Sequence, residues 1–190
     1  MLSHSKALGD RLADPLARRF LRWQVRPNQL TLLGLFVSGT AALGFARGRL
    51  RLAASLLIVA GLLDILDGAL ARCSGRVTPF GAFLDSVIDR YSDLIVLLGL
   101  VVYFLRLETR EGLALTLATL VGTIMVSYCR ARAESIGATC KVGLMERGER
   151  MIVLIAGALF HQLIPALWAL AVLTNLTALH RIHHTWRVTR

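Results

Sequence analysis

Cysteine is scarce in this sequence, and the three residues present, Cys73, Cys129 and Cys140, have neither paired nor metal-binding spacing. We therefore expect free thiols rather than a disulfide framework or a cysteine-ligated zinc site. Internal repeats and low-complexity segments are also lacking. A cleavable signal peptide is not expected, because about 25 largely polar and basic residues precede the first apolar run.

Acidic residues are few: Asp and Glu number 12 against 22 Lys and Arg, which gives a net charge of +10. This excess would suggest a nucleic-acid partner in a soluble protein, but 55% of the residues are apolar and the mean hydropathy is +0.61. Such values are typical of an integral membrane protein. The basic residues flank apolar runs, so we expect contact with anionic lipid head groups and no nucleic-acid partner. The length fits a single domain over residues 1–190.

The apolar runs predict an all-α membrane protein with a bundle of six transmembrane helices over residues 27–187. The spans are expected at roughly residues 28–46, 52–71, 80–105, 113–128, 151–163 and 166–179, with Pro165 separating the last two. Several are short for a ~30 Å hydrocarbon core, so polar helix extensions into water are expected. The preceding segment, residues 1–26, has leucines at helical spacing among basic residues. It predicts an amphipathic helix in the membrane interface, with a solvated cap on the bundle as the alternative.

The distribution of positive charge predicts the orientation of this bundle. With the N-terminus in the cytoplasm and six alternating spans, sixteen basic residues fall on the inner side and five on the outer side. The arginine-rich turn at residues 47–51 runs against this bias. We therefore expect a multi-pass protein of the cell membrane, and the polar sequence between the second and third spans should face the cytoplasm.

Four aspartates inside or beside these apolar runs are the strongest functional signal. Asp64 and Asp67 are three residues apart, and Asp85 and Asp89 are four apart, so each pair shares one face of a helix. Carboxylates within membrane spans are costly and usually functional. Four together need a cation, and all-oxygen ligands favour one or two magnesium ions, with manganese as the alternative. The sequence thus predicts a metal site at these four aspartates.

Neighbouring residues suit phosphate chemistry at such a metal. The ions would bridge a pyrophosphate and stabilise a departing phosphate. Gly68 would let a ligand approach the backbone, Arg72 could clamp a phosphate with its guanidinium fork, and Thr78 could add a hydroxyl contact. Asp89, at the end of the helix face that also carries Asp85, is the candidate general base for an attacking hydroxyl.

The stretch from Asp64 to Asp89 fits the signature DxxDGxxARx8GxxxDxxxD without a gap. The chain therefore resembles the CDP-alcohol phosphatidyltransferase family at Asp64, Asp67, Gly68, Ala71, Arg72, Gly81, Asp85 and Asp89. The resemblance implies that an alcohol attacks the β-phosphate of a CDP-linked lipid, CDP-diacylglycerol or an archaeal analogue, and that CMP leaves. It implies metal ligation by the four aspartates, with Asp89 also the base, and it suggests a homodimer. It further implies CDP-lipid contacts at Asn28, Thr31, Asp67, Gly68, Arg72 and Thr78.

A second polar cluster bears on the identity of the acceptor alcohol. Several arginines around one pocket imply an anionic acceptor such as a phosphate monoester, and the candidates are Arg130, Arg132, Arg147, Arg150 and Arg181. The segment resembles the family branch that makes phosphatidylinositol phosphate or archaetidylinositol phosphate, which implies inositol 1-phosphate as acceptor. The acceptor phosphate would then contact Arg130, Arg132, Arg150 and Arg181, although Arg130 stands where lysine is usual. For Arg147, an ordinary membrane-flanking charge is an equal alternative.

Further expectations concern the neighbours of these residues. Glu134, Glu146 and Glu149 are expected to pair with the arginines, and Asp93 is expected behind the metal ligands, paired with Arg90. Glycerol 3-phosphate is the alternative acceptor. A small ion or proton transporter is the alternative of another class, and it predicts acids near the middle of the bilayer with access from both sides. Arg72 beside the acids favours the enzyme.

Overall fold

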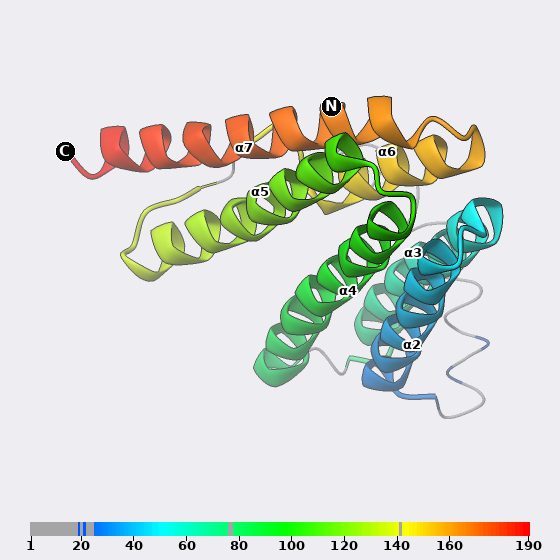
Figure 1. The fold of residues 1–190 in the computed structure, drawn as a ribbon. Coiled ribbons are helices and arrows are strands. Elements are labelled where there is room, and N and C mark those ends of the chain that lie inside the picture. Colours follow the sequence, from blue (N-terminus) through cyan, green and yellow to red (C-terminus); the bar gives the residue numbers. More distant parts are fainter. Residues whose placement is uncertain (1–18, 20, 22–24, 76–77, 141) are drawn as a thin grey trace.

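The computed structural model describes residues 19, 21, 25–75, 78–140 and 142–190, and this part of the chain is helical apart from its connections. Its helices are α2 (Pro27–Ala46), α3 (Leu50–Cys73), α4 (Pro79–Arg106), α5 (Arg110–Ser135), α6 (Arg147–Leu159) and α7 (Leu163–Val188) (Figure 1). The all-α prediction is confirmed, and each helix overlaps the apolar run predicted for it. The amphipathic helix expected over residues 1–26 lies almost wholly outside the described residues.

Four of the helices, α2, α3, α5 and α7, are long and apolar enough to cross a membrane. The charges of the aspartate-rich stretch interrupt the apolar sequence of α4, and α6 has only 13 residues. Large apolar side chains such as Phe36 and Leu176 are exposed on the outer surface. Such side chains suit contact with lipid rather than water.

Local sequence determines where the helices begin. Pro27 and Pro79 stand in the first turns of α2 and α4, where a backbone N–H has no partner within the helix. Thr78 caps α4, because its Oγ1 accepts a hydrogen bond of 3.0 Å from the N–H of Gly81. Pro165 also lies in a first turn, that of α7, so the prediction that it separates the last two helices is wrong. The chain reverses instead at residues 160–162.

The bundle is arranged around α2, which packs against both α3 and α4. In the described part of the chain, the backbones of α3 and α4 do not approach each other directly. Helix α5 packs along α7, and α6 packs against α3 and α7 (Figure 1). Residues of α3 and α4 can therefore meet only through side chains that extend across the space between them.

The close approach of α2 and α4 depends on one glycine. A Cβ at Gly99 would lie 2.4 Å from the carbonyl oxygen of Ala42, which is too close for any side chain. Phe45 and Leu100, next along the two helices, are fully buried. Small residues commonly permit such approaches between membrane helices. This packing holds α4 against α2, and the polar residues of both helices lie toward their N-terminal ends.

Candidate active site

Three carboxylates meet between α3 and α4. One oxygen from each of Asp64, Asp67 and Asp85 lies within 4.8 Å of the other two. The side chain of Asp67 is buried, at 5% exposed, whereas Asp64 and Asp85 are partly exposed. The helical spacing places Asp64 and Asp67 on one face of α3, and α4 supplies the third carboxylate. The arrangement concentrates negative charge where water is limited.

The start of α2 fixes the buried member of this group. Thr31 Oγ1 donates a hydrogen bond of 2.7 Å to Oδ2 of Asp67, and the same hydroxyl lies 3.3 Å from the carbonyl oxygen of Pro27. Both Thr31 and Asp67 are buried. A charge-assisted bond between buried groups is stronger than a neutral one. A hydroxyl near the start of α2 therefore orients one carboxylate of α3.

Asp89 lies one turn beyond Asp85 on α4 and outside the group of three. Its Oδ1 is 2.9 Å from Nη1 of Arg147, and its Oδ2 is 3.9 Å from Nη1 of Arg90. The same Nη1 of Arg147 is 2.8 Å from Oδ1 of Asp64. A single guanidinium nitrogen of α6 therefore links a carboxylate of α3 with one of α4.

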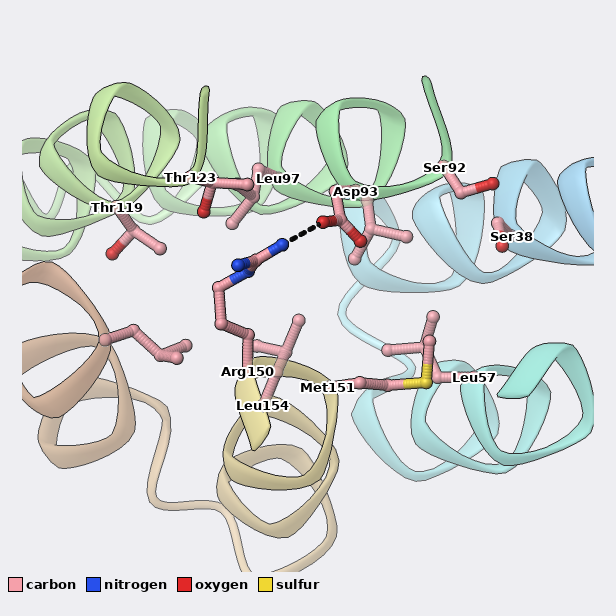
Figure 2. A pocket seen from close by; sticks show the side chains of 12 residues that line it. Ser38, Leu57, Ser92, Asp93, Leu97, Thr119, Thr123, Arg150, Met151 and Leu154 are labelled. Atoms are coloured by element: carbon pink, nitrogen blue, oxygen red, sulfur yellow. Dashed lines mark hydrogen bonds and ion pairs between the residues drawn. The ribbon is translucent and has the colours of Figure 1, made fainter. Parts of the chain in front are cut away.

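Asp93, a further turn along α4, does not pair with Arg90 as predicted. Arg90 is exposed, and its Nη1 donates to the carbonyl oxygen of Ser86 instead. Arg150 Nη2 donates to Asp93 Oδ2 at 2.7 Å (Figure 2), and Arg147 Nε lies 3.5 Å from Asp93 Oδ1. The physical reason is that Arg147 and Arg150, one turn apart on α6, both extend toward α4.

Two of the arginines predicted to bind the acceptor phosphate are buried, Arg150 at 8% and Arg181 at 3% exposed. Arg150 Nη1 donates to the carbonyl oxygen of Met145 at 3.3 Å. Arg181 donates through Nη1 to the carbonyl oxygen of Val126 at 2.6 Å and through Nε to that of Val142 at 2.8 Å. Buried donors are usually satisfied in this way. These bonds fix the connection between α5 and α6 against α7.

The other two predicted arginines, Arg130 and Arg132, lie near the end of α5 and are more exposed. Arg130 Nε is 2.9 Å from Oε1 of Glu134, and Arg132 Nη1 donates to Oγ of Ser135 at 3.2 Å. Arg181 bonds the carbonyl oxygens of Val126, one turn before Arg130, and of Val142, three residues before the Met145 that Arg150 contacts. The structure thus gathers these three arginines at one end of the bundle and directs the described bond of Arg132 to its own helix.

Two of the glutamates that were expected to pair with arginines have a different role. Glu146 and Glu149 form a capping box at the start of α6, in which the N–H of Glu146 donates to the Glu149 carboxylate. Within the described residues, Glu134 alone of the three makes the expected pair, with Arg130. The capping box fixes the first turn of α6, and that turn carries Arg147 and Arg150.

The residues predicted to contact a nucleotide lie around the start of α4 and the end of α3. A Cβ on Gly81 would lie 3.0 Å from Oγ1 of Thr78 and 3.7 Å from Oδ1 of Asn28. A Cβ on Gly68 would lie 3.3 Å from Nη1 of Arg72, so this arginine folds back over the glycine. Asn28, Thr78 and Arg72 are exposed. They form an accessible polar surface beside the buried acids.

The acids of the site and the arginines of α6 line two adjoining hollows. The first is lined by polar residues of α2, α3, α4 and α6, among them Thr31, Asp64, Asp67, Asp89 and Arg147. The second, of about 460 Å³ including its open mouth, contains Asp93 and Arg150 with the hydroxyl groups of Thr119 and Thr123 (Figure 2). Ser38 and Ser92 line both hollows, so they adjoin.

The donor set fits a divalent cation on chemical grounds. Carboxylate oxygens are the ligands that magnesium and manganese prefer. The oxygens of Asp64, Asp67 and Asp85 are close enough for one ion to reach all three. Asp89 lies one turn from Asp85, on the same face of α4. The residues present can therefore hold such an ion.

The contacts of Arg147 were not predicted from the sequence, in which substrate binding and a membrane-flanking charge were equal alternatives. A signal was available: Arg147 and Arg150 are three residues apart at the start of a short apolar run, so they share one helix face. The hydroxyl groups of Ser38 and Ser92 were also missed. Serine is common in membrane helices for packing alone, so no sequence signal distinguished them.

Comparison with known proteins gives extensive matches. A model of the CDP-alcohol phosphatidyltransferase family matches residues 24–181. The archaetidylinositol phosphate synthase of Methanothermobacter thermautotrophicus is 39% identical over 193 residues, which cover 98% of this chain and 95% of that protein. The crystal structure of Mycobacterium tuberculosis phosphatidylinositol phosphate synthase with CDP-DAG bound has a TM-score of 0.86 at 36% identity, covering 93% of this chain and 94% of that one. The same enzyme in complex with manganese and citrate gives a TM-score of 0.84 at 36% identity, with 92% and 88% covered.

Proposed function

Because this chain belongs to the CDP-alcohol phosphatidyltransferase family, we propose that it transfers a phosphatidyl-type group from a CDP-linked lipid to inositol 1-phosphate and releases CMP. The observation that carries the proposal is the group of three carboxylates within 4.8 Å of one another, placed beside the arginines of α6. The archaeal and mycobacterial relatives are both named as synthases of inositol phosphate lipids. These names support an inositol phosphate as the acceptor.

The proposed metal ligands are Asp64, Asp67, Asp85 and Asp89, which would hold two magnesium or manganese ions. When bound, the ions supply positive charge that neutralises the donor pyrophosphate and stabilises the leaving CMP. The all-oxygen donor set supports this assignment, and so does the close grouping of Asp64, Asp67 and Asp85. The manganese complex of the mycobacterial relative supports it independently.

The proposed donor-binding residues are Asn28, Thr31, Asp67, Gly68, Arg72 and Thr78. Two of them orient others, because Thr31 holds Asp67 and the absence of a side chain at Gly68 leaves room for Arg72. A guanidinium group can bond two oxygens of a phosphate at once. Asn28 and Thr78 both approach Gly81. A nucleotide bound beside Gly81 would therefore contact the N-terminal ends of both α2 and α4.

The proposed reaction is a displacement at the β-phosphorus of the donor. A hydroxyl oxygen of the acceptor forms a bond to this phosphorus, and the bond from phosphorus to the bridging oxygen breaks. The electron pair of the broken bond leaves with CMP, and Asp89 takes the proton of the attacking hydroxyl. The position of Asp89 supports this role, because it lines the same hollow as Asp64 and Asp67. Its carboxylate lies 2.9 Å from Nη1 of Arg147, which fixes its position in this hollow.

The proposed acceptor-phosphate residues are Arg130, Arg132, Arg150 and Arg181. Arg150 supports the proposal most strongly, because its buried positive charge lines the second hollow together with the hydroxyl groups of Thr119 and Thr123. The bonds of Arg181 to the carbonyl oxygens of Val126, one turn before Arg130, and of Val142 also support a common site. If these arginines hold the phosphate of inositol 1-phosphate, the hydroxyl groups of the inositol ring would face the acids of α4.

We further propose that all six helices cross the membrane as one domain over residues 1–190, with residues 1–26 in the interface and the active site facing the cytoplasm. The four long apolar helices support this topology, and α4 and α6 are packed among them. A cytoplasmic site would let water-soluble CMP escape. The exposed apolar side chains allow contact with lipid or with a second copy, and we propose a homodimer in the plasma membrane.

The test is CMP release by the purified protein in nanodiscs with magnesium and CDP-diacylglycerol, repeated with the archaeal ether-lipid donor. Inositol 1-phosphate, glycerol 3-phosphate, free inositol and serine would be offered separately. We expect CMP release only when inositol 1-phosphate is the acceptor offered. Release with glycerol 3-phosphate alone would retain the transfer reaction and reject the acceptor, and an absence of CDP-lipid binding would reject the donor.

A further inference from the structure

Arg147 contacts three aspartates that come from two different helices. Its Nη1 lies 2.8 Å from Asp64 and 2.9 Å from Asp89, and its Nε lies 3.5 Å from Asp93. The side chain is 22% exposed, and Nε is buried without a hydrogen bond of good geometry. The contacts of Arg147 are thus with the protein's own acids.

The helix backbones do not provide this connection. Within the described residues, α3 and α4 are not direct neighbours, and α6 packs against α3 and α7 but not against α4. The side chain of Arg147 therefore spans the space in which the two halves of the acidic cluster meet. Arg150 adds a second link, from α6 to Asp93 on α4, at 2.7 Å.

The acidic cluster also requires a positive charge such as that of Arg147. Carboxylate oxygens of Asp64, Asp67 and Asp85 lie within 4.8 Å of one another, Asp89 shares a nitrogen of Arg147 with Asp64, and all four aspartates are buried or partly buried. Burying like charges without a partner is costly, and removing one partner of a buried pair is strongly destabilising. The positive charge of Arg147 offsets part of the repulsion between the acids of α3 and α4.

We propose that Arg147 is a built-in counter-ion of the acidic cluster, which holds Asp64 and Asp89 together without metal and competes with metal for them. This inference rests on the metal site of the proposed function. A divalent ion on the same oxygens would stand a few ångströms from the guanidinium, and like charges at that range repel. Asp93 offers Arg147 a position away from Asp64, because the ion pair with its unbonded Nε can shorten into a hydrogen bond. Arg147 is thus a positioning residue whose contacts differ between the metal-free and metal-loaded states.

The experiment measures the affinity for Mn²⁺ by electron paramagnetic resonance of free manganese, in detergent and without lipid substrates. The variants are Arg147→Met, Arg147→Lys and, as a control for net charge, Arg187→Met. Arg187 is exposed near the end of α7 and is outside the proposed site. We expect Arg147→Met to bind Mn²⁺ about tenfold more tightly than the natural protein because a competing charge is gone. Arg147→Lys should fall between the two, and Arg187→Met should match the natural protein.

Thermal unfolding of the same proteins gives an independent readout. Without metal, Arg147→Met should unfold at a lower temperature than the natural protein. Saturating Mn²⁺ should raise the unfolding midpoint of Arg147→Met by more than it raises that of the natural protein. Equal or weaker Mn²⁺ binding by Arg147→Met would overturn the counter-ion role while leaving the metal site intact. If Arg147→Met folds only with metal, the test rests on Arg147→Lys. The counter-ion role then requires that Arg147→Lys bind Mn²⁺ more tightly than the natural protein does. Absence of Mn²⁺ binding by the natural protein would overturn the metal site and this inference together.

Discussion

The hydroxyl of Thr31 donates a hydrogen bond of 2.7 Å to Oδ2 of Asp67, so a residue near the start of α2 orients a carboxylate of α3. Both groups are buried. Thr31→Val keeps the shape and removes the donor. Loss of a hydrogen bond to a charged group costs about 1.5–3 kcal/mol, so we expect at least a tenfold fall in the rate of CMP release.

Thr31→Ser is the matched control, because it keeps the hydroxyl and should retain most of the activity. Initial rates at saturating donor and acceptor would measure both variants. A Thr31→Val protein within twofold of the natural rate would show that the bond to Asp67 does not position a working carboxylate.

Asp89→Asn should abolish transfer and leave the protein folded. The change removes the proposed base and one metal charge but keeps the size of the side chain. CDP-diacylglycerol binding and the thermal unfolding midpoint would be measured beside CMP release. Near-normal turnover in this variant would remove Asp89 from the mechanism.

Gly68→Ala should weaken donor binding. The added methyl would lie 3.3 Å from Nη1 of Arg72, so the guanidinium must shift by a few tenths of an ångström at the place where it is proposed to clamp the donor phosphate. We expect the KM for CDP-diacylglycerol to rise several-fold while the KM for the acceptor stays constant. Gly39→Ala is the control, since a Cβ there would meet nothing within 4 Å. An unchanged KM for the donor in Gly68→Ala would contradict the assignment.

Gly99→Ala should destabilise the bundle rather than alter its chemistry. A Cβ there would lie 2.4 Å from the backbone of Ala42, so α2 and α4 must separate. Overpacking of this kind costs about 1–3 kcal/mol. Thermal unfolding in detergent should show a lower midpoint than for Gly39→Ala, which serves again as the control. Equal midpoints would mean that the helices can adjust without cost.

Arg130→Met tests the acceptor site at an exposed position. The surface pair with Glu134 contributes little to stability, so the variant should fold normally. We expect the KM for inositol 1-phosphate to rise about tenfold, as for loss of one charge-assisted contact, with the donor KM unchanged. Arg110→Met, at the opposite end of α5, is the control. A variant with natural kinetics for both substrates would remove Arg130 from the acceptor site.

The positions of the helices could be predicted because long apolar runs interrupted by Gly, Pro and charge leave few alternatives. Pro165 misled the prediction, since a proline in a first turn does not differ in sequence from one in a connection. Helix α6 has 13 residues, fewer than the about 20 that a straight span needs.

The acidic cluster was predictable in part, because helical spacing alone puts Asp64 with Asp67 and Asp85 with Asp89. The convergence of α3 and α4 is a tertiary event, and only the known motif anticipated it. Ion-pair partners were less predictable: Asp93 pairs with Arg147 and Arg150 rather than with the nearby Arg90. Long side chains reach across helices, and sequence separation carries no information about such contacts.

The most direct measurement is a competition between two acceptors. The protein would be reconstituted with CDP-diacylglycerol and magnesium, supplied with equal concentrations of inositol 1-phosphate and glycerol 3-phosphate, and its lipid products identified by mass. Phosphatidylinositol phosphate should predominate, and its formation should stop when EDTA removes the metal. Phosphatidylglycerophosphate as the main product would contradict the proposed acceptor, and product formation that persists in EDTA would contradict the metal site.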